Sequence, residues 1–244
     1  MRIAILGAGN IGATLARKLQ AAGHAVVLAN SREPETIAAV ADQAGVKAAF
    51  APDAVKDAQV VIIAIPQGRM PEMREVVKDL PDDVVIIDAG NYYPVRDGRV
   101  ESIESGQPES LWVAEQLGRP VIKAWNAVLA GTLGERGRPA GAPDRIALPV
   151  AGDNPEAKKI CFRLMEETGF EPVDGGSLAE SWRQQPGAKS YCTELSASDL
   201  RKALETTERA GAYARRDRVG QALRAHVGKV TNDVILEANR GVHA

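Results

Sequence analysis

The sequence predicts an α/β fold with a doubly wound parallel sheet, followed by a smaller C-terminal α+β domain. Short runs of β-branched and aliphatic residues alternate with amphipathic stretches of helical length through the first half of the 244 residues. This alternation is typical of βαβ units, which build parallel sheets covered by helices. A glycine-rich turn, Gly7-Ala8-Gly9-Asn10-Ile11-Gly12, joins the first apolar run to the first amphipathic one, as in a Rossmann-like fold.

The expected elements of the first half follow one another in a regular order. Ser31 is a good capping residue for the second helix, and Pro34 stands where a missing N–H does no harm. Residues 91–110 are polar and contain glycine and proline, so we expect a long loop there. The predicted strands are 3–6, 25–29, 46–50, 59–65, 84–88 and 121–125, and the predicted helices are 10–22, 34–44, 69–80 and 111–117.

The pattern changes after about residue 140. Residues 131–143 contain four glycines and two prolines, the composition of a linker or mobile loop. We therefore predict a first domain over residues 1–140 and a smaller one over 141–244. In the second part the expected strands are 145–151 and 170–174, and the expected helices are 155–167, 198–214 and about 219–238.

Composition excludes several classes of protein. The net charge is −2, with 30 basic and 32 acidic residues mixed along the chain, so we expect no binding to nucleic acid or to an anionic membrane. No apolar run approaches the roughly 20 residues of a membrane helix. The two cysteines, Cys161 and Cys192, lack the CxxC spacing and fit a reduced compartment. The chain also begins directly in a strand, and these features together predict a cytoplasmic protein.

The glycine-rich turn predicts a dinucleotide site, because it follows a strand and opens a helix. Gly7 allows the tight turn, Gly9 lets the backbone approach a pyrophosphate, and Gly12 lets the helix pack against the strand. Asn10 and Ile11 then occupy the first turn of the helix, where free N–H groups and the helix dipole favour negative charge.

The end of the second strand indicates which nucleotide is bound. Sites for NAD commonly place an acidic residue there to accept hydrogen bonds from the ribose 2′-hydroxyl. This chain has Asn30, Ser31 and Arg32, which together offer an amide, a hydroxyl and a guanidinium suited to a phosphate. Glu33 and Glu35 weaken the local positive field. We therefore predict NADP as the cofactor, with NAD as the alternative.

The ends of the fourth, fifth and sixth strands are expected to surround the nicotinamide, because ligands lie across the carboxyl ends of such sheets. Pro66 stiffens the turn after the fourth strand, and Ile65 can pack against the ring. Asn91 and Asn126 can hydrogen-bond the carboxamide, although each also has an ordinary role in a turn.

No side chain stands out as a catalytic acid, base or metal ligand. The histidines lie in a turn, a late helix and the tail, at His24, His226 and His243. Their absence from the site fits hydride transfer, in which the cofactor supplies the chemistry and the protein supplies orientation. Aromatic side chains in or near the loops can stack on a planar acceptor or simply pack in the core; these are Tyr92, Tyr93, Trp125, Trp182 and Tyr191.

These motifs resemble those of the NADP-dependent oxidoreductases that reduce or reoxidise the deazaflavin coenzyme F420. The resemblance rests on the glycine-rich turn, on Asn30-Ser31-Arg32, on Ile65-Pro66 and on Lys123-Ala124-Trp125-Asn126, and extends to about Gly175. The reductase domain of the STEAP metalloreductases, which passes hydride from NADPH to a flavin, has a similar pattern. Residues 33–36, Glu-Pro-Glu-Thr, lack a basic residue that some relatives place near the phosphate.

The resemblance implies an enzyme with NADP, a flavin or deazaflavin as its small-molecule acceptor, and no catalytic side chain or metal. It assigns the pyrophosphate to Gly9, Asn10 and Ile11, the 2′-phosphate to Ser31 and Arg32, and the nicotinamide side to Ile65, Pro66 and Asn126. The apolar late helices also suggest a homodimer.

Two other functions remain open. One is an imine or ketone reductase of the pyrroline-carboxylate reductase type, in which an all-helical dimerisation domain generally follows a similar N-terminal domain. The strands expected after residue 140 argue against it. The other is a protein that binds NADP(H) without catalysis and senses the redox state.

Overall fold

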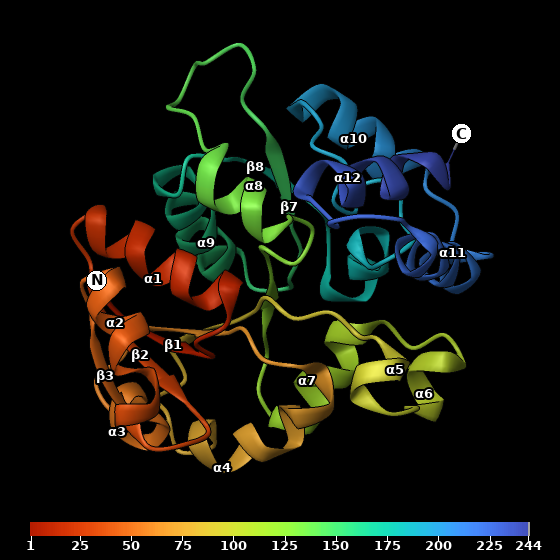
Figure 1. The fold of residues 1–244 in the computed structure, drawn as a ribbon. Helices are drawn as coiled ribbons and strands as arrows, with labels where there is room; N and C mark the ends of the chain where they lie inside the picture. The colour runs from red at the N-terminus through yellow and green to blue at the C-terminus, as the bar shows by residue number, and fades with distance from the viewer. Residues whose placement is uncertain (244) are drawn as a thin grey trace.

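The centre of the molecule is a six-stranded parallel sheet (Figure 1). The computed structural model describes residues 1–243. The strand order is β3-β2-β1-β4-β5-β6, so the order reverses beside β1, where ligands bind in sheets of this kind. The strands are β1 (Arg2–Leu6), β2 (Ala25–Asn30), β3 (Lys47–Phe50), β4 (Val60–Ile63), β5 (Val85–Asp88) and β6 (Ile122–Lys123).

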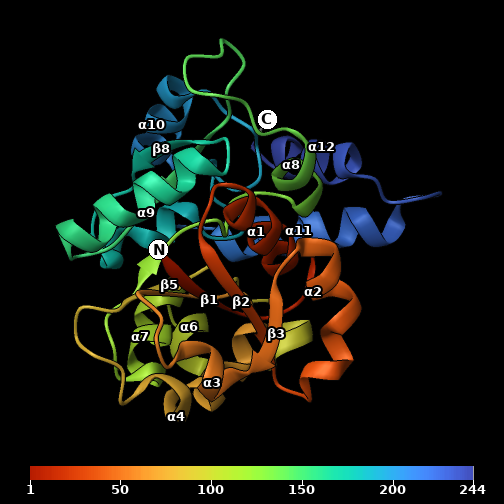
Figure 2. The ribbon, with the colours of Figure 1, turned by 90° about the vertical axis from the view of Figure 1, so that its left-hand side faces the viewer.

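Helices cover both faces of this sheet (Figures 1 and 2). Because side chains alternate along a strand, Ile3 and Ile5 of β1 join one buried cluster while Ala4 and Leu6 join another. The first cluster is closed by α1 (Asn10–Ala21), α2 (Ala38–Ala44) and α9 (Pro155–Glu167), and the second by α3 (Ala51–Val55), α4 (Arg74–Val77) and α7 (Glu109–Leu117). The predicted doubly wound parallel sheet is confirmed.

The segment after β4 differs from the single helix predicted over 69–80. It forms a 3₁₀ helix, η2 (Gln67–Met73), and only then the short α4. Pro71 lies inside η2 and lacks the N–H that an α-helix would use there. The expected loop over 91–110 also contains two single-turn helices, α5 (Pro94–Asp97) and α6 (Glu101–Glu104).

The C-terminal part contains the second sheet and several helices. Its strands β7 (Ala147–Val150) and β8 (Glu171–Asp174) lie on either side of α9 in the sequence, as predicted, and they pair in parallel. The following elements are the 3₁₀ helix η3 (Leu178–Gln184) and α10 (Ala197–Thr206), which packs on the small sheet through Leu200 and Leu204. The C-terminal part is therefore one parallel βαβ unit followed by helices.

The late helices are shorter than predicted. Three helices, α10, α11 (Ala212–Ala225) and α12 (Asn232–Gly241), replace the two expected over 198–214 and 219–238. Gly211 and Gly228 have φ values of +73° and +113°, a left-handed backbone that interrupts an α-helix. The glycine-rich stretch after residue 130 begins with α8 (Ala130–Glu135).

The two cysteines, Cys161 and Cys192, are both free and buried.

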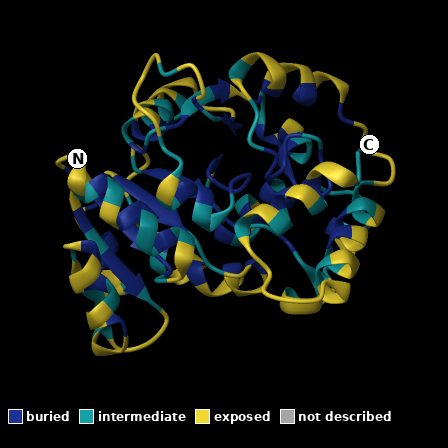
Figure 3. Cartoon of the chain, turned by 45° about the horizontal axis from the view of Figure 1, so that its top comes forward, coloured by how far each residue is buried: buried dark blue, intermediate teal, exposed yellow. Residues whose placement is uncertain are grey.

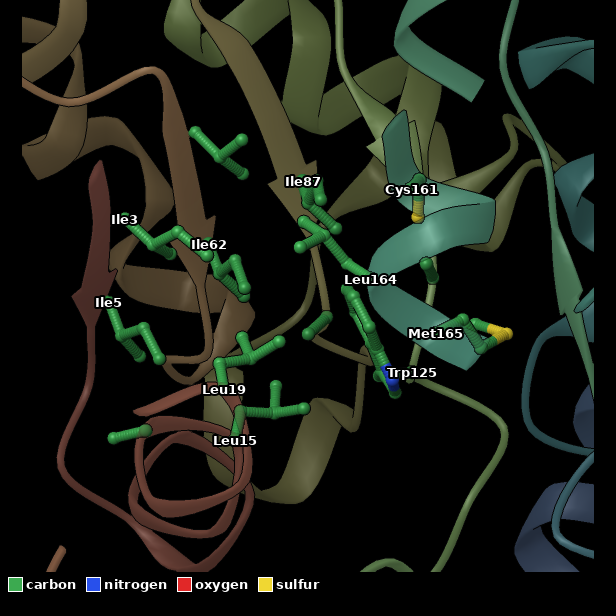
Figure 4. Packing of buried hydrophobic residues seen from close by; sticks show 14 of the residues in the cluster. Ile3, Ile5, Leu15, Leu19, Ile62, Ile87, Trp125, Cys161, Leu164 and Met165 are labelled. Atoms are coloured by element: carbon green, nitrogen blue, oxygen red, sulfur yellow. The ribbon is translucent and has the colours of Figure 1, made fainter. Parts of the chain in front are cut away.

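One buried cluster joins the two parts of the chain. Cys161, Leu164 and Met165 of α9 pack into the cluster that contains the side chains of β1 and α1 (Figure 4). A backbone bridge between Lys123 and Ala151 also links β6 to the residue after β7. Buried residues follow β1, β4, β5 and β7, whereas exposed residues lie on outer helix faces and in loops (Figure 3). Within residues 1–243, no helix has the length and apolar character needed to cross a bilayer.

Candidate functional site

The loop between β1 and α1 requires glycine at two positions. Gly7 has a φ of +121°, and a Cβ there would lie 2.3 Å from the Ala64 carbonyl oxygen. A Cβ on Gly12 would lie 1.9 Å from the carbonyl oxygen of Gly7. The roles predicted for these glycines, a tight turn and close packing of the helix, therefore have a direct steric cause.

Gly9 is different, because a Cβ there would have no atom within 4 Å. It precedes Asn10, the first residue of α1, and no side chain in the described structure caps this helix. The first intrahelical bond runs from the Ala13 N–H to the Gly9 carbonyl oxygen. The N–H groups of Asn10 and Ile11 are thus at an uncapped helix end next to a glycine that leaves room for a ligand, an arrangement that suits a pyrophosphate.

The three residues predicted to bind the phosphate, Asn30, Ser31 and Arg32, have different surroundings in the loop after β2. The Asn30 carboxamide accepts from the Arg32 N–H at 2.9 Å and donates to Thr36 Oγ1 at 3.1 Å, so it shapes the loop. The Arg32 guanidinium is exposed, and no side-chain bond holds it within residues 1–243. Ser31 does not cap the next helix as expected, because Glu33 is the residue before η1 (Pro34–Ile37).

Ser31 instead contacts an arginine that the sequence did not indicate. Its Oγ accepts a hydrogen bond from Nη1 of Arg69 at 3.1 Å. Arg69 lies in η2, after β4, and the strand order places the ends of β2 and β4 on either side of β1. Ser31 and Arg69 both line a cavity of about 120 Å³. Its lining residues are Leu6, Gly7, Asn30, Ser31, Ala51, Ile65, Pro66, Arg69, Glu72 and Met73.

The residues predicted beside the nicotinamide come from three strand ends that meet. Ile65 is half-buried and Pro66 is exposed at the start of η2. Asn91 Nδ2 donates to the Asn126 carbonyl oxygen at 2.9 Å, and Asn126 Nδ2 donates back to Asn91 Oδ1 at 3.0 Å. Asn126 Nδ2 also donates to the Gln184 carbonyl oxygen at 2.8 Å. Both amide hydrogens of Asn126 are therefore used within the protein, whereas half-buried Asn91 keeps donor capacity.

The backbone immediately before Asn126 is strained. Trp125 has a φ of +55°, an uncommon value for a bulky residue, and its side chain is buried with Nε1 donating to Thr168 Oγ1 at 3.3 Å. Such strain persists only where the surrounding structure fixes it, and it often occurs at functional sites. Here it fixes the direction in which the chain leaves β6.

A buried ion pair joins the ends of β5 and β6. Lys123 Nζ donates to Asp88 Oδ2 at 2.8 Å and to the Gly90 carbonyl oxygen at 2.6 Å, and both charged side chains are fully buried. Ser110 Oγ and the Gly90 N–H donate to the same carboxylate at 3.0 and 2.9 Å. Sequence reasoning did not identify this network, although an acid and a base at the ends of neighbouring apolar strands were a usable signal. It holds the backbone that precedes Asn91.

Glu109 is a second buried carboxyl group in this region. Its Oε2 accepts from the Tyr92 N–H at 3.0 Å, and its carbonyl oxygen accepts from Gln67 Nε2 at 3.1 Å. Oε1 has no partner in the described structure, and burial raises the pKa of Glu109 to about 7. Glu109 thus contacts the segment after β5 through its carboxyl group and the segment after β4 through its backbone carbonyl. The carboxyl gains or loses its proton near neutral pH.

Comparison with known proteins identifies the family of this chain. Residues 2–92 match the family model described as NADP oxidoreductase, coenzyme F420-dependent. Protein YjhV of Escherichia coli is 38% identical over 109 residues, which are 43% of this chain and 77% of YjhV. The chain belongs to this family of oxidoreductases.

Two further similarities extend beyond the family match. The rat metalloreductase STEAP3 is 27% identical over 186 residues, covering 74% of this chain but only 35% of STEAP3. The crystal structure of protein SMa0349 from Sinorhizobium meliloti is 33% identical, with a TM-score of 0.64 over 74% of this chain and 87% of that one. As a member of the family, the chain is an oxidoreductase that uses a nicotinamide cofactor.

Half of the ten aromatic side chains of this oxidoreductase are buried. Tyr92 and Trp125 are buried, so packing is their observed role. The Tyr93 and Tyr191 hydroxyl groups are 2.8 Å apart and link the loop after β5 to the C-terminal part, and burial raises the pKa of both. Half-buried Trp182 lies under the guanidinium of Arg183, 4.5 Å from its ring centre.

Histidines and metal ligands do not gather at the site. His24 contacts the N-terminal amine at 3.0 Å and Glu167 Oε2 at 2.6 Å, before the start of β2. Among residues 1–243, no group of three or more His, Cys, Asp or Glu side chains is placed to hold a metal ion.

Proposed function

We propose that this enzyme transfers hydride between NADP(H) and a flavin-like or deazaflavin acceptor. The observation that carries the proposal is that the uncapped start of α1 and the polar end of β2 follow neighbouring parallel strands. They offer free backbone N–H groups at Asn10 and Ile11, and a hydroxyl and a guanidinium at Ser31 and Arg32. No acidic side chain takes the position that would accept from a 2′-hydroxyl, because Asn30 stands there.

The preference for NADP over NAD depends on charge at the 2′-position. A phosphate group carries about −1.5 to −2 charges near neutral pH and accepts several hydrogen bonds. The exposed guanidinium of Arg32 can turn toward this phosphate. Glu33 and Glu35 are also exposed, and their negative charges repel it. Donors at Ser31 and Arg32 favour the phosphate at short range, where hydrogen bonding to an ionised group is strongest.

The residues around the strand ends then orient the nicotinamide. Bound NADP(H) supplies the hydride itself, so no acid or base on the protein is needed for that transfer. Ile65 offers an apolar surface, Pro66 stiffens the turn, and Asn91 offers its remaining amide donor. The buried network of Asp88 and Lys123 keeps this surface in place.

The acceptor class is proposed from the family and from the absence of a catalytic side chain. A flavin or deazaflavin accepts hydride on a planar ring, so binding and orientation are the main demands on the protein. An imine reductase of the pyrroline-carboxylate type is the second candidate. The strands β7 and β8 argue against the all-helical C-terminal domain that such enzymes generally have.

The direct test is oxidation of NADPH with F420, FMN and FAD as acceptors, with NADH measured in parallel. We expect turnover above background with at least one acceptor, and a higher rate with NADPH than with NADH. A cyclic imine serves as the comparison substrate. Turnover with the imine alone would support the second candidate, and tight NADPH binding without any turnover would support a redox sensor.

We also propose that residues 1–140 form the nucleotide-binding domain and residues 141–244 a substrate and dimerisation domain of a cytoplasmic homodimer. The loop after α11 supports a partner surface, because Val227 is 95% exposed and Val230 is 42% exposed. Light scattering on the eluted protein is expected to give twice the mass of 25.9 kDa. A mass of one chain would contradict the dimer.

A further inference from the structure

Among residues 1–243, Arg69 is the only arginine that lines the cavity at the end of β2. It lies in the same cavity wall as Gly7, Asn30 and Pro66, although 37 residues separate it from Arg32 in the sequence. Its Nη1 donates to Ser31 Oγ at 3.1 Å. Since the guanidinium already donates to the Ser31 oxygen, the Ser31 hydroxyl hydrogen is left to point elsewhere, toward a ligand.

Glu72 holds this guanidinium in one orientation. Arg69 Nε donates to Glu72 Oε1 at 2.9 Å, and Nη2 donates to Oε2 at 2.5 Å. This two-bond geometry fixes the plane of the guanidinium, and the pairing raises the pKa of Arg69 and lowers the pKa of Glu72. Arginine has five N–H donors, so two remain after the bonds to Glu72 and Ser31. The side chain is therefore both positioned and able to bind.

The charge balance of the loop gives these donors a role. Residues 32–35 contain one arginine and two glutamates, which give a net charge of −1 directly beside the predicted phosphate position. A doubly charged phosphate would meet a net repulsion from that segment alone. Arg69 is paired with Glu72, so together they add no net charge. What Arg69 contributes from across the cavity is its two free N–H donors, which can contact the phosphate together with the Ser31 hydroxyl.

We propose that Arg69 is a second guanidinium for the 2′-phosphate of NADP(H), positioned by Glu72 and coupled to Ser31. This assignment rests on the proposed NADP function and identifies a residue that determines specificity at that site. The same guanidinium could instead stack on the adenine ring, which NAD and NADP share. The two roles differ in whether the loss of Arg69 affects one nucleotide or both.

The test is calorimetric titration of NADPH and NADH into wild-type protein and three variants. Arg69→Ala should weaken NADPH binding about tenfold and leave NADH binding within about twofold, because only NADPH carries the phosphate. Arg69→Lys keeps the charge but loses the planar donors, so it should fall between wild type and Arg69→Ala. Arg99→Ala is the matched control, because Arg99 is an exposed arginine paired with Glu101 at 3.2 Å and does not line the cavity.

The outcomes separate this assignment from the proposed function. A wild-type protein that binds NADH as tightly as NADPH would contradict the NADP assignment before any variant is considered. A wild-type preference for NADPH that Arg69→Ala leaves unchanged would overturn the role of Arg69 alone. Equal losses for both nucleotides would assign Arg69 to the adenine and would also overturn the proposal. Circular dichroism of each variant confirms that the fold is intact, as expected for a side chain that is 47% exposed.

Discussion

Arg32 is the residue on which the choice of cofactor mainly depends. Its guanidinium is exposed, so its removal should leave the fold unchanged. We expect Arg32→Ala to weaken NADPH binding by about tenfold to a hundredfold, because each charge-assisted hydrogen bond contributes about 1.5–3 kcal/mol. NADH binding should change little. Fluorescence titration of both nucleotides measures the difference.

Salt provides an independent check on Arg32. An exposed charge pair is screened as the ionic strength rises, so the wild-type preference for NADPH should shrink with added salt. If Arg32→Ala weakens both nucleotides equally, the arginine supports the loop or the adenine. The NADP assignment would then depend on Ser31, on Arg69 and on the missing acid.

Glu109 should make the stability of the protein depend on pH. Burial raises its folded pKa to about 7, above the ordinary value of 4.5, so the folded state holds the proton more tightly than the unfolded state. This contribution is fully present below about pH 4.5 and is lost as the pH rises toward 7. The free energy of unfolding of the wild type should therefore fall by about 3 kcal/mol over this pH range, as the size of the pKa shift implies, and Glu109→Gln should remove this fall. Urea unfolding of both proteins at pH 5 and pH 8 measures it, and parallel pH profiles would contradict it.

At single residues, sequence reasoning succeeded where a position has one physical requirement. The glycines at positions 7 and 12 follow from steric contacts within the loop, which the spacing indicates. Asn126 was placed at the correct strand end, but its bonds to Asn91 and Gln184 depend on the packing of η3, which no local pattern shows. Arg69 was missed for the same reason, since its contact with Ser31 spans 38 residues.

At the level of elements, the phosphate loop allows two glycines to be compared. Gly9→Ala adds a methyl group in open space, so it should leave the melting temperature within a few degrees of wild type but abolish most nucleotide binding. Gly12→Ala places its methyl group 1.9 Å from the Gly7 carbonyl oxygen and should destabilise the fold by about 1–3 kcal/mol or more.

Calorimetry of unfolding and titration with NADPH test the pair together. Gly12→Ala is the control for stability, and Gly9→Ala reports the space that the pyrophosphate occupies. Normal NADPH binding by a folded Gly9→Ala variant would show that the pyrophosphate does not lie against this loop.

The periodic pattern predicted the long elements better than the short ones. The strands of the main sheet, α1 and the β7-α9-β8 unit were expected and are present, because alternating apolar runs determine them. The turn of η2 at Pro71 and the breaks at Gly211 and Gly228 were not expected. Each depends on whether a proline or glycine interrupts a helix or is tolerated in it, which tertiary packing decides.

Across the whole molecule, the shared core leads us to expect cooperative unfolding. Leu164 and Met165 of the C-terminal part are fully buried in the cluster that contains Ile3 and Leu15 of the first part. Separating the two parts would expose this surface, which is unfavourable. Differential scanning calorimetry should therefore show one transition, with equal calorimetric and van't Hoff enthalpies. Two resolved transitions would show that the parts fold independently.

The most direct test of the cofactor site is a crystal structure with bound NADP(H). We predict that the pyrophosphate lies at the start of α1 beside Gly9, and that the 2′-phosphate contacts Ser31, Arg32 and Arg69. The nicotinamide should lie beside Ile65, Pro66 and Asn91. A nucleotide bound elsewhere, or a 2′-phosphate that faces solvent without contact to Ser31 or either arginine, would contradict the proposed function of this oxidoreductase.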